Sequence, residues 1–156
     1  MTVRQPVYAE PQSSEVERFR PFIDGQGDCA TASSRVASEI AGIAVECGYY
    51  RYPETVLDVW RLWDPEPGFR DCELDVTHWW NRLPDGRILD VTHCQFGGEE
   101  IALLSPSDAE YQRYVPLGSM KREEAAVWEE RVRCAAEQAQ SRPDDTDLCQ
   151  LQTDRP

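Results

Sequence analysis

The chain has 156 residues, of which 40% are apolar, and this is enough for one domain with a hydrophobic core. Its net charge of −13 argues against nucleic acids and anionic membrane surfaces as partners, because both would repel it. No apolar run approaches the roughly 20 residues that cross a bilayer. The N-terminal sequence MTVRQPVYAEPQSSEVERF also lacks the apolar core of a signal peptide. We therefore expect a cytoplasmic protein whose thiols stay reduced.

The N-terminal part of the chain predicts an arm, a loop and then a helix. Residues 1–15 hold two prolines and a Gln-Ser-Ser cluster, typical of a mobile arm, and residues 16–23 fit a short helix or strand. The segment 25–27, Gly-Gln-Gly, is a loop by composition. Asp28 is a plausible N-cap, after which Cys29, Ala32, Val36 and Ile40 recur at helical spacing. Gly42 is well placed to end this helix.

A β-hairpin is the main feature of the middle of the chain. The segment 43–50 suits a strand, although Gly48 weakens it, and 54–63 fits either a helix or a strand. Segments 74–83 and 87–92 are rich in aromatic and aliphatic residues, and they flank Pro-Asp-Gly at 84–86, a turn signal. This pattern predicts a hairpin.

Helices are expected in the C-terminal part. Ser105 and Pro106 start a short helix through Tyr114, and Ser119 caps a longer one over residues 120–140. Residues 142–156 form a frayed acidic tail by composition. We therefore predict one α+β domain over 16–141, with a Cys-bearing helix packed on a small antiparallel sheet and helices at the C-terminal end.

Three residues carry chemistry in an order typical of cysteine hydrolases. Cys29 lies in the first turn of the predicted helix, where unpaired N–H groups and the helix dipole favour a thiolate. His78 lies on the first hairpin strand and would act as base and then acid. Asp90 lies on the second strand and would orient the imidazole. Asp28 complicates this arrangement, since its charge beside Cys29 opposes a thiolate unless the carboxylate caps the helix.

The length of the hairpin loop decides whether His78 and Asp90 can meet. If the loop is 84–86, Leu83 faces Arg87 and Trp80 lies opposite Asp90. His78 is then one diagonal step from Asp90 on the same face, about 7–8 Å between backbones. If the loop is only the Asp-Gly pair at 85–86, Asp90 points to the opposite face from His78. A triad therefore requires the three-residue loop.

Further residues are candidates for binding substrate. The oxyanion of a thiol-ester intermediate needs donors, and the backbone N–H of Cys29 and the side chain of Gln26 are candidates. Trp79 and Trp80 point to opposite faces of the hairpin, so one should be core and the other a wall of a substrate cleft or a cover for the sheet. Gln95 and Thr92 are interpreted as structural residues at the strand end. No organic cofactor and no metal are expected.

Several alternatives remain open at this stage. Cys29 could be a small packing residue, and His78 and Asp90 could be structural. A metal site is a rival, with ligand types at four positions, but their spacing departs from that of structural zinc sites; the four are Cys72, His78, His93 and Cys94. His93 is also a rival base, although in the register with the three-residue loop it would face away from Asp90. The same fold could instead be a catalytically silent module that recruits a protein partner.

The residues resemble a known family. GQGDCA, followed by HWWNRLPDGRILDVTHCQF, is similar to the GQCA-type and HYWNRLPDG…DLT…QF motifs of the YunG-like family of small bacterial proteins, over residues 25–96. The resemblance implies a papain-like or transglutaminase-like fold with Cys29, His78 and Asp90 as the triad, and it implies no particular substrate. The chain departs from the pattern by two residues, Gly27 and Asp28, between Gln26 and the cysteine. The expected activity is acyl chemistry on an amide of a peptide or protein.

Overall fold

The structure is a computed structural model that describes residues 12–23, 28–55, 74–97 and 99–140. It is mixed helix and strand, which confirms the α+β class. The α-helices are α1 (Gln12–Glu17), α2 (Cys29–Glu39) and α4 (Arg122–Gln140). The strands are β1 (Ala44–Arg51), β2 (Asp75–Arg82), β3 (Ile88–Asp90), β4 (Ala102–Leu104) and β5 (Tyr114–Pro116). Four 3₁₀ segments lie among the described residues, η1 (Arg20–Phe22), η2 (His93–Phe96), η3 (Ala109–Arg113) and η4 (Leu117–Ser119).

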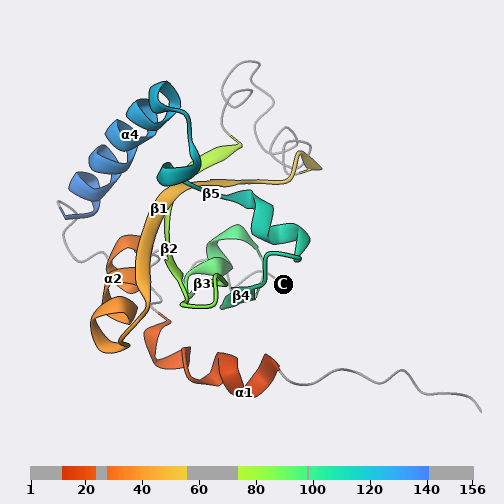
Figure 1. Cartoon of the computed structure of the whole chain (residues 1–156). Helices are drawn as coiled ribbons and strands as arrows, with labels where there is room; N and C mark the ends of the chain where they lie inside the picture. Colours follow the sequence, from red (N-terminus) through yellow and green to blue (C-terminus); the bar gives the residue numbers. More distant parts are fainter. Residues whose placement is uncertain (1–11, 24–27, 56–73, 98, 141–156) are drawn as a thin grey trace, which may run out of the picture.

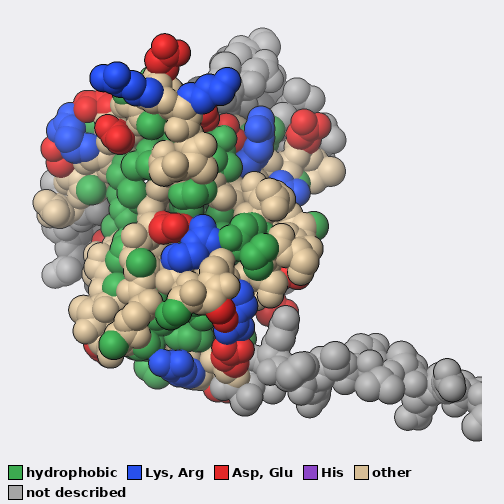
Figure 2. All heavy atoms as spheres, in the orientation of Figure 1, with side chains coloured by type: hydrophobic (Ala, Val, Ile, Leu, Met, Phe, Trp, Pro, Cys, Tyr) green, Lys and Arg blue, Asp and Glu red, His purple; other side chains and the backbone are tan. Residues whose placement is uncertain are grey.

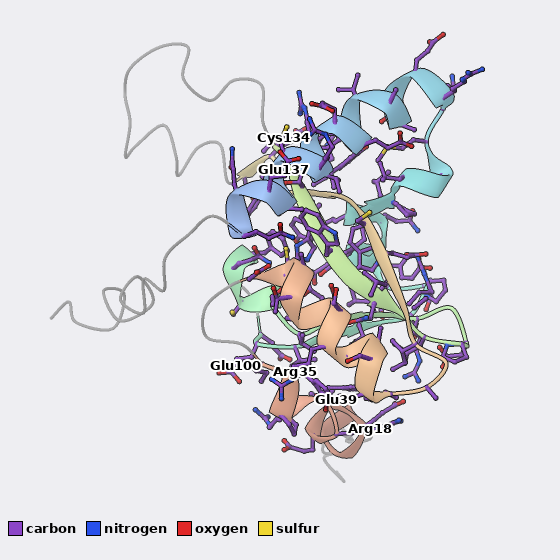
Figure 3. All side chains as sticks on the ribbon, turned by 90° about the vertical axis from the view of Figure 1, so that its left-hand side faces the viewer. Arg18, Arg35, Glu39, Glu100, Cys134 and Glu137 are labelled. Atoms are coloured by element: carbon purple, nitrogen blue, oxygen red, sulfur yellow. The ribbon has the colours of Figure 1, made fainter. Side chains whose placement is uncertain are left out.

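The five strands form one curled antiparallel sheet in the order β4-β3-β2-β1-β5 (Figure 1). Helices α2 and α4 both lie on one side of it. Figure 3 looks onto that side, with Arg35 and Glu39 labelled on α2 and Cys134 and Glu137 on α4. The other face of the sheet curls inward, and η2 and η3 pack against it through Phe96 and Tyr111. The molecule therefore has a helix-covered face and an inner face.

The helix that carries Cys29 forms where the sequence predicts it. The side chain of Asp28 accepts hydrogen bonds from the backbone N–H groups of Ala30 and Thr31, so it is the N-cap. The buried residues of α2 include Ala32 and Val36, which lie four positions apart on one face of the helix. The helix ends at Glu39, earlier than Gly42 implies. Gly42 instead takes a positive φ of 85° in the turn that leads to β1.

The hairpin adopts the register that brings His78 and Asp90 to one face. Asn81 pairs with Leu89 and Arg82 pairs with Ile88. The loop is therefore the three residues 84–86, closed by a bond from the Leu83 N–H to the Arg87 carbonyl. Gly86 has a φ of 89°, a conformation that favours glycine. Of the two loops that the sequence leaves open, the structure has the three-residue loop that a triad requires.

Alternation along β2 and β3 divides the core into two clusters. The α2-side cluster is entirely apolar and lies between the sheet, α2 and the N-terminal segment; its buried members are Phe19, Phe22, Ala32, Val36, Ile43, Leu83, Leu89, Val91 and Ile101. The inner cluster lies in the curl of the sheet and is mainly aromatic; its buried members are Tyr50, Trp80, Ile88 and Tyr114. Each hairpin strand contributes to both clusters because its side chains alternate between the two faces.

Gly48 lies in the middle of β1, and β1 covers nearly the same residues as the predicted strand 43–50. A Cβ at this position would come within 2.0 Å of the Val115 carbonyl oxygen. Glycine is therefore needed for β5 to approach β1, where Gly48 pairs with Pro116. The strand continues through Gly48 because the residue serves this contact, and β5 in turn brings Tyr114 into the inner cluster.

Some sequence expectations differ from the structure. Residues 105–114 do not form an α-helix: a turn leads to the 3₁₀ segment η3, and Tyr114 begins β5. Ser119 does not cap α4, which starts at Arg122; the Ser119 hydroxyl donates to the Pro116 carbonyl. Residues 12–15, assigned to the arm, are helical, and Glu15 pairs with Arg87 at the hairpin turn. Residues 1–11, 56–73 and 142–156, and Gln26, lie outside the described residues.

Among the helices that the structure describes, none is long and apolar enough to span a membrane. Charged side chains of both signs lie among hydrophobic ones on the face shown in Figure 2. Neither histidine reaches the surface on that face, and both are buried.

Candidate functional site

Cys29, His78 and Asp90 come from three elements that meet at one place. Cys29 is the first residue of α2, His78 lies on β2, and Asp90 is the last residue of β3. Because β3 pairs with β2 only at Asn81 and Arg82, the described part of β3 does not extend along β2 as far as His78. The edge of β2 beside His78 is thus the place where the N-terminus of α2 can approach the imidazole.

His78 and Asp90 form a buried pair. Their Nε2 and Oδ2 atoms are 2.7 Å apart, and the side chains are 0% and 1% exposed. Burial by itself would lower the pKa of His78, but the charge and hydrogen bond of Asp90, with a hydrogen bond to Cys29, raise the pKa to about 9. Burial would likewise raise the pKa of Asp90, but His78 and the donors of Thr92 hold it below its usual range. The geometry therefore favours imidazolium and carboxylate.

Cys29 lies close enough to His78 for its side chain to raise the pKa of the imidazole. Since Nε2 faces Asp90, the ring nitrogen available to the thiol is Nδ1. Cys29 itself is a free cysteine of intermediate exposure, whereas His78 is fully buried behind it. The Cys29 residue is therefore partly exposed to solvent, while His78 is shielded from it.

The charge of Asp28 is engaged in capping α2. Besides its bonds to the Ala30 and Thr31 N–H groups, Asp28 accepts a 2.6 Å hydrogen bond from the Thr31 hydroxyl. These bonds disperse the negative charge that the sequence placed beside Cys29. The Cys29 N–H is not among the donors of this cap and remains a candidate oxyanion donor.

Asp90 has two further partners that the sequence analysis did not assign to the site. Its Oδ1 accepts from the backbone N–H and the hydroxyl of Thr92, both at 2.9 Å. Its Oδ2 accepts from the Tyr114 hydroxyl at 3.0 Å in addition to His78. Thr92 could have been found from the Asp-x-Thr spacing, which suits an Asx-type turn. Tyr114 offers no local signal, because β5 reaches Asp90 only through the curl of the sheet.

His93 does not face away from Asp90, and that expectation is wrong. Strand β3 ends at Asp90 and the chain enters η2, so strand alternation no longer applies. The His93 Nδ1 lies 3.0 Å from the Tyr114 hydroxyl, and its Nε2 lies 3.1 Å from Glu110 Oε1. His93 is thus a buried partner of Tyr114, and its Nδ1 lies 3.9 Å from Asp90 Oδ2.

Gln95 lies beside the reactive face of His78. Its side-chain amide donates to the Thr92 hydroxyl at 3.1 Å and lies 3.4 Å from His78 Nδ1, the nitrogen that faces Cys29. The sequence interpretation of Gln95 as purely structural therefore omits its position at the site. Gln26, the predicted oxyanion donor, is outside the described residues.

The two tryptophans do not form a cleft at the site. Trp80 is 0% exposed in the inner cluster, and its indole N–H donates to Glu46 at 2.9 Å. Trp79 pairs with Cys47 on the helix-covered face, opposite to His78. The role of Trp79, as a wall of a substrate cleft or as a cover for the sheet, stays a prediction. The core role that was expected for one of them belongs to Trp80.

A metal site was the rival interpretation of four His and Cys side chains. Among the described residues, no group of three or more His, Cys, Asp and Glu side chains is placed to hold a metal ion. Of the four candidate ligands, Cys72 lies outside the described residues, and His78 and His93 are engaged in the contacts above.

Comparisons with protein-family models, with curated proteins and with solved structures found no match to this chain.

Proposed function

We propose that the protein is a thiol-dependent enzyme that acts on amides, as a peptidase, amidase, deamidase or transglutaminase-like acyltransferase. The observation that carries this proposal is the contact series from Cys29 to His78 to Asp90 at the N-terminus of a helix. A thiol at a helix start beside an imidazolium is the environment that generates a reactive thiolate. The proposed fold is papain-like or transglutaminase-like, in keeping with the resemblance to the YunG-like family.

Each residue has a defined role in the proposed reaction. The Cys29 thiolate attacks the amide carbonyl carbon, and the carbonyl oxygen becomes an oxyanion. His78 transfers the proton on Nδ1 to the leaving nitrogen, the C–N bond breaks, and a thioester to Cys29 remains. Water or an amine then attacks the thioester and gives its proton to the neutral His78; the C–S bond breaks, which releases the acid or the new amide and restores the thiolate and the imidazolium. Asp90 holds the imidazole by Nε2 throughout.

Two groups are placed to stabilise the oxyanion. The Cys29 N–H lies at the positive end of α2, outside the cap made by Asp28. The Gln95 amide lies next to His78 Nδ1, on the side where Cys29 approaches. In the proposed reaction these two groups would donate to the oxygen of the carbonyl bonded to the Cys29 sulfur, and such donors contribute strongly to acyl transfer.

Selective alkylation tests the proposal without knowledge of the substrate. The full chain is treated with limiting iodoacetamide at pH 6, and the modified cysteines are quantified by peptide mass spectrometry. Cys29 is expected to react at least about tenfold faster than Cys134, because Cys29 lies beside the His78 imidazolium and Cys134 lies beside Glu130 and Arg133 on α4. Substitution of His78 by Asn should remove this advantage.

Two controls separate reactivity from simple exposure. Cys134→Ser, on α4, should leave the labelling of Cys29 unchanged, and urea-unfolded protein should react equally at both positions. Equal rates in the folded wild-type protein would contradict the proposal and favour a catalytically silent binding module.

A further inference from the structure

The buried hydrogen bonds continue beyond Asp90, away from Cys29. The Tyr114 hydroxyl donates its single proton to Asp90 Oδ2. It must therefore accept, rather than donate, in its 3.0 Å contact with His93 Nδ1. The other nitrogen of His93 faces Glu110, which also accepts from the Tyr50 hydroxyl at 3.1 Å. The series thus runs from the proposed base through Asp90 to a second imidazole.

Asp90 receives four hydrogen bonds, and they differ in function. The two bonds from Thr92 go to Oδ1 and fix the orientation of the carboxylate. The bonds from His78 and Tyr114 go to the same oxygen, Oδ2. Removing the Tyr114 hydroxyl would leave the carboxylate oriented by Thr92, with more of its charge directed at His78. Tyr114 and His78 therefore compete for the charge on one oxygen.

We propose that Tyr114, itself held by His93, is a positioning residue that draws part of the Asp90 charge away from His78 and so limits how tightly His78 holds its proton. The contact with His93 keeps the Tyr114 hydroxyl directed at Asp90, because the Nδ1–H occupies its acceptor side. A proton held less tightly passes more readily to the leaving nitrogen. The importance of this effect for catalysis rests on the proposed function, but the effect on His78 does not.

The titratable groups around His78 and Asp90 come from every element that packs on them. They are Cys29 from α2, Tyr50 from β1, His93 from η2, Glu110 from η3 and Tyr114 from β5. Of the two tyrosines among them, Tyr114 is the one whose hydroxyl bonds Asp90, and removing this hydroxyl leaves the ring in the inner cluster. Its ring packs edge-on against Tyr50 and Trp80, with centroids 5.1 Å and 5.4 Å away. Tyr114→Phe keeps this packing.

The test is an NMR titration of the His78 ring nitrogens in ¹⁵N-histidine-labelled full-length protein. The chain has only two histidines, so His93→Asn assigns both sets of signals. In Tyr114→Phe, the His78 midpoint should rise by about half to one pH unit. Site-specific 3-fluorotyrosine at position 114 has a more acidic hydroxyl, which donates more strongly, and should lower the midpoint.

A second tyrosine provides the control for removing a hydroxyl. Tyr111→Phe removes a hydroxyl that bonds Arg82 and the Gly86 carbonyl and should leave the midpoint unchanged. A midpoint that stays or falls in Tyr114→Phe would overturn the proposal. If that variant does not fold, the fluorotyrosine protein decides, and an unchanged midpoint there would overturn it as well. Repeating the titration in Cys29→Ser measures the effect of Tyr114 on His78 in the absence of the thiol. The proposal about Tyr114 can therefore hold if the proposed enzymatic function fails, and the enzymatic function can hold if the proposal about Tyr114 fails.

Discussion

The two faces of the sheet share their strands but differ in what they bury. Ile88 and Leu89 are neighbours on β3 and both are fully buried, yet Leu89 packs in the α2-side cluster and Ile88 in the inner cluster. The α2-side cluster is apolar throughout. The inner face adds His78, Asp90 and His93 to its aromatic residues, and all three are buried.

The two faces therefore differ in how they affect the stability of the fold. Burying apolar side chains stabilises a fold in proportion to the area removed from water, whereas buried imidazoles and carboxylates cost free energy unless each is hydrogen-bonded. On the helix-covered face, the buried amide of Asn81 donates to the backbone of Ser33 and Ala44 and thereby ties α2 to the sheet. On the inner face, the polar groups bond chiefly to one another, the pattern expected where function is retained at the expense of stability.

The largest expected effect comes from truncating a buried side chain of the α2-side cluster. Leu89→Ala removes a fully buried side chain from the α2-side cluster and should lower the free energy of unfolding by about 2–5 kcal/mol, measured by urea titration. Val127→Ala, at a site 53% exposed on α4, should change it little. The His78 titration should be unchanged in both variants. A displaced His78 midpoint in Leu89→Ala would show that the two faces are coupled.

The buried His78 and Asp90 pair on the inner face should make the free energy of unfolding depend on pH. The pKa of His78 is raised from 6.5 to about 9 in the folded protein, so its stabilising contribution is complete below about pH 6.5 and is lost as the pH rises through 9. Between pH 6 and 9.5 the wild-type protein should lose about 3 kcal/mol relative to His78→Asn. Denaturant unfolding of both proteins across this range measures the difference. Parallel curves for the two proteins would contradict an imidazolium paired with Asp90.

Local patterns in the sequence were sufficient for some elements. Helix α2 followed from an N-capping Asp28 and apolar spacing, because both signals act within a few turns of one helix. The hairpin register was left open between two loops. Since both Ile88 and Leu89 are apolar, either register buries a side chain on each face. The structure selects the three-residue loop, in which Leu89 joins Leu83 on the α2 side.

Contacts distant in sequence could not be predicted in this way. Tyr114 was assigned to a helix end, but it begins a three-residue strand that pairs with β1, and so short a strand has no periodicity to detect. His93 was placed by extending strand alternation past the residue at which the strand ends. The Cys29, His78 and Asp90 positions could be proposed because their residue types are distinctive. Their partners Tyr114 and Gln95 depend on how the chain curls back.

The smallest expected effect concerns Gln95, and it distinguishes an oxyanion donor from a structural residue. Gln95→Leu should slow acylation of Cys29 by p-nitrophenyl acetate about 10- to 100-fold, because that reaction passes through a tetrahedral oxyanion. It should leave the rate of alkylation by iodoacetamide within about twofold, because displacement of iodide forms no oxyanion, and the thiolate and His78 are retained. Intact mass spectrometry follows both reactions on the same protein. If both rates fell together, Gln95 would act by supporting Thr92 and Asp90, to which it is linked by a 3.1 Å bond, rather than by contacting the substrate.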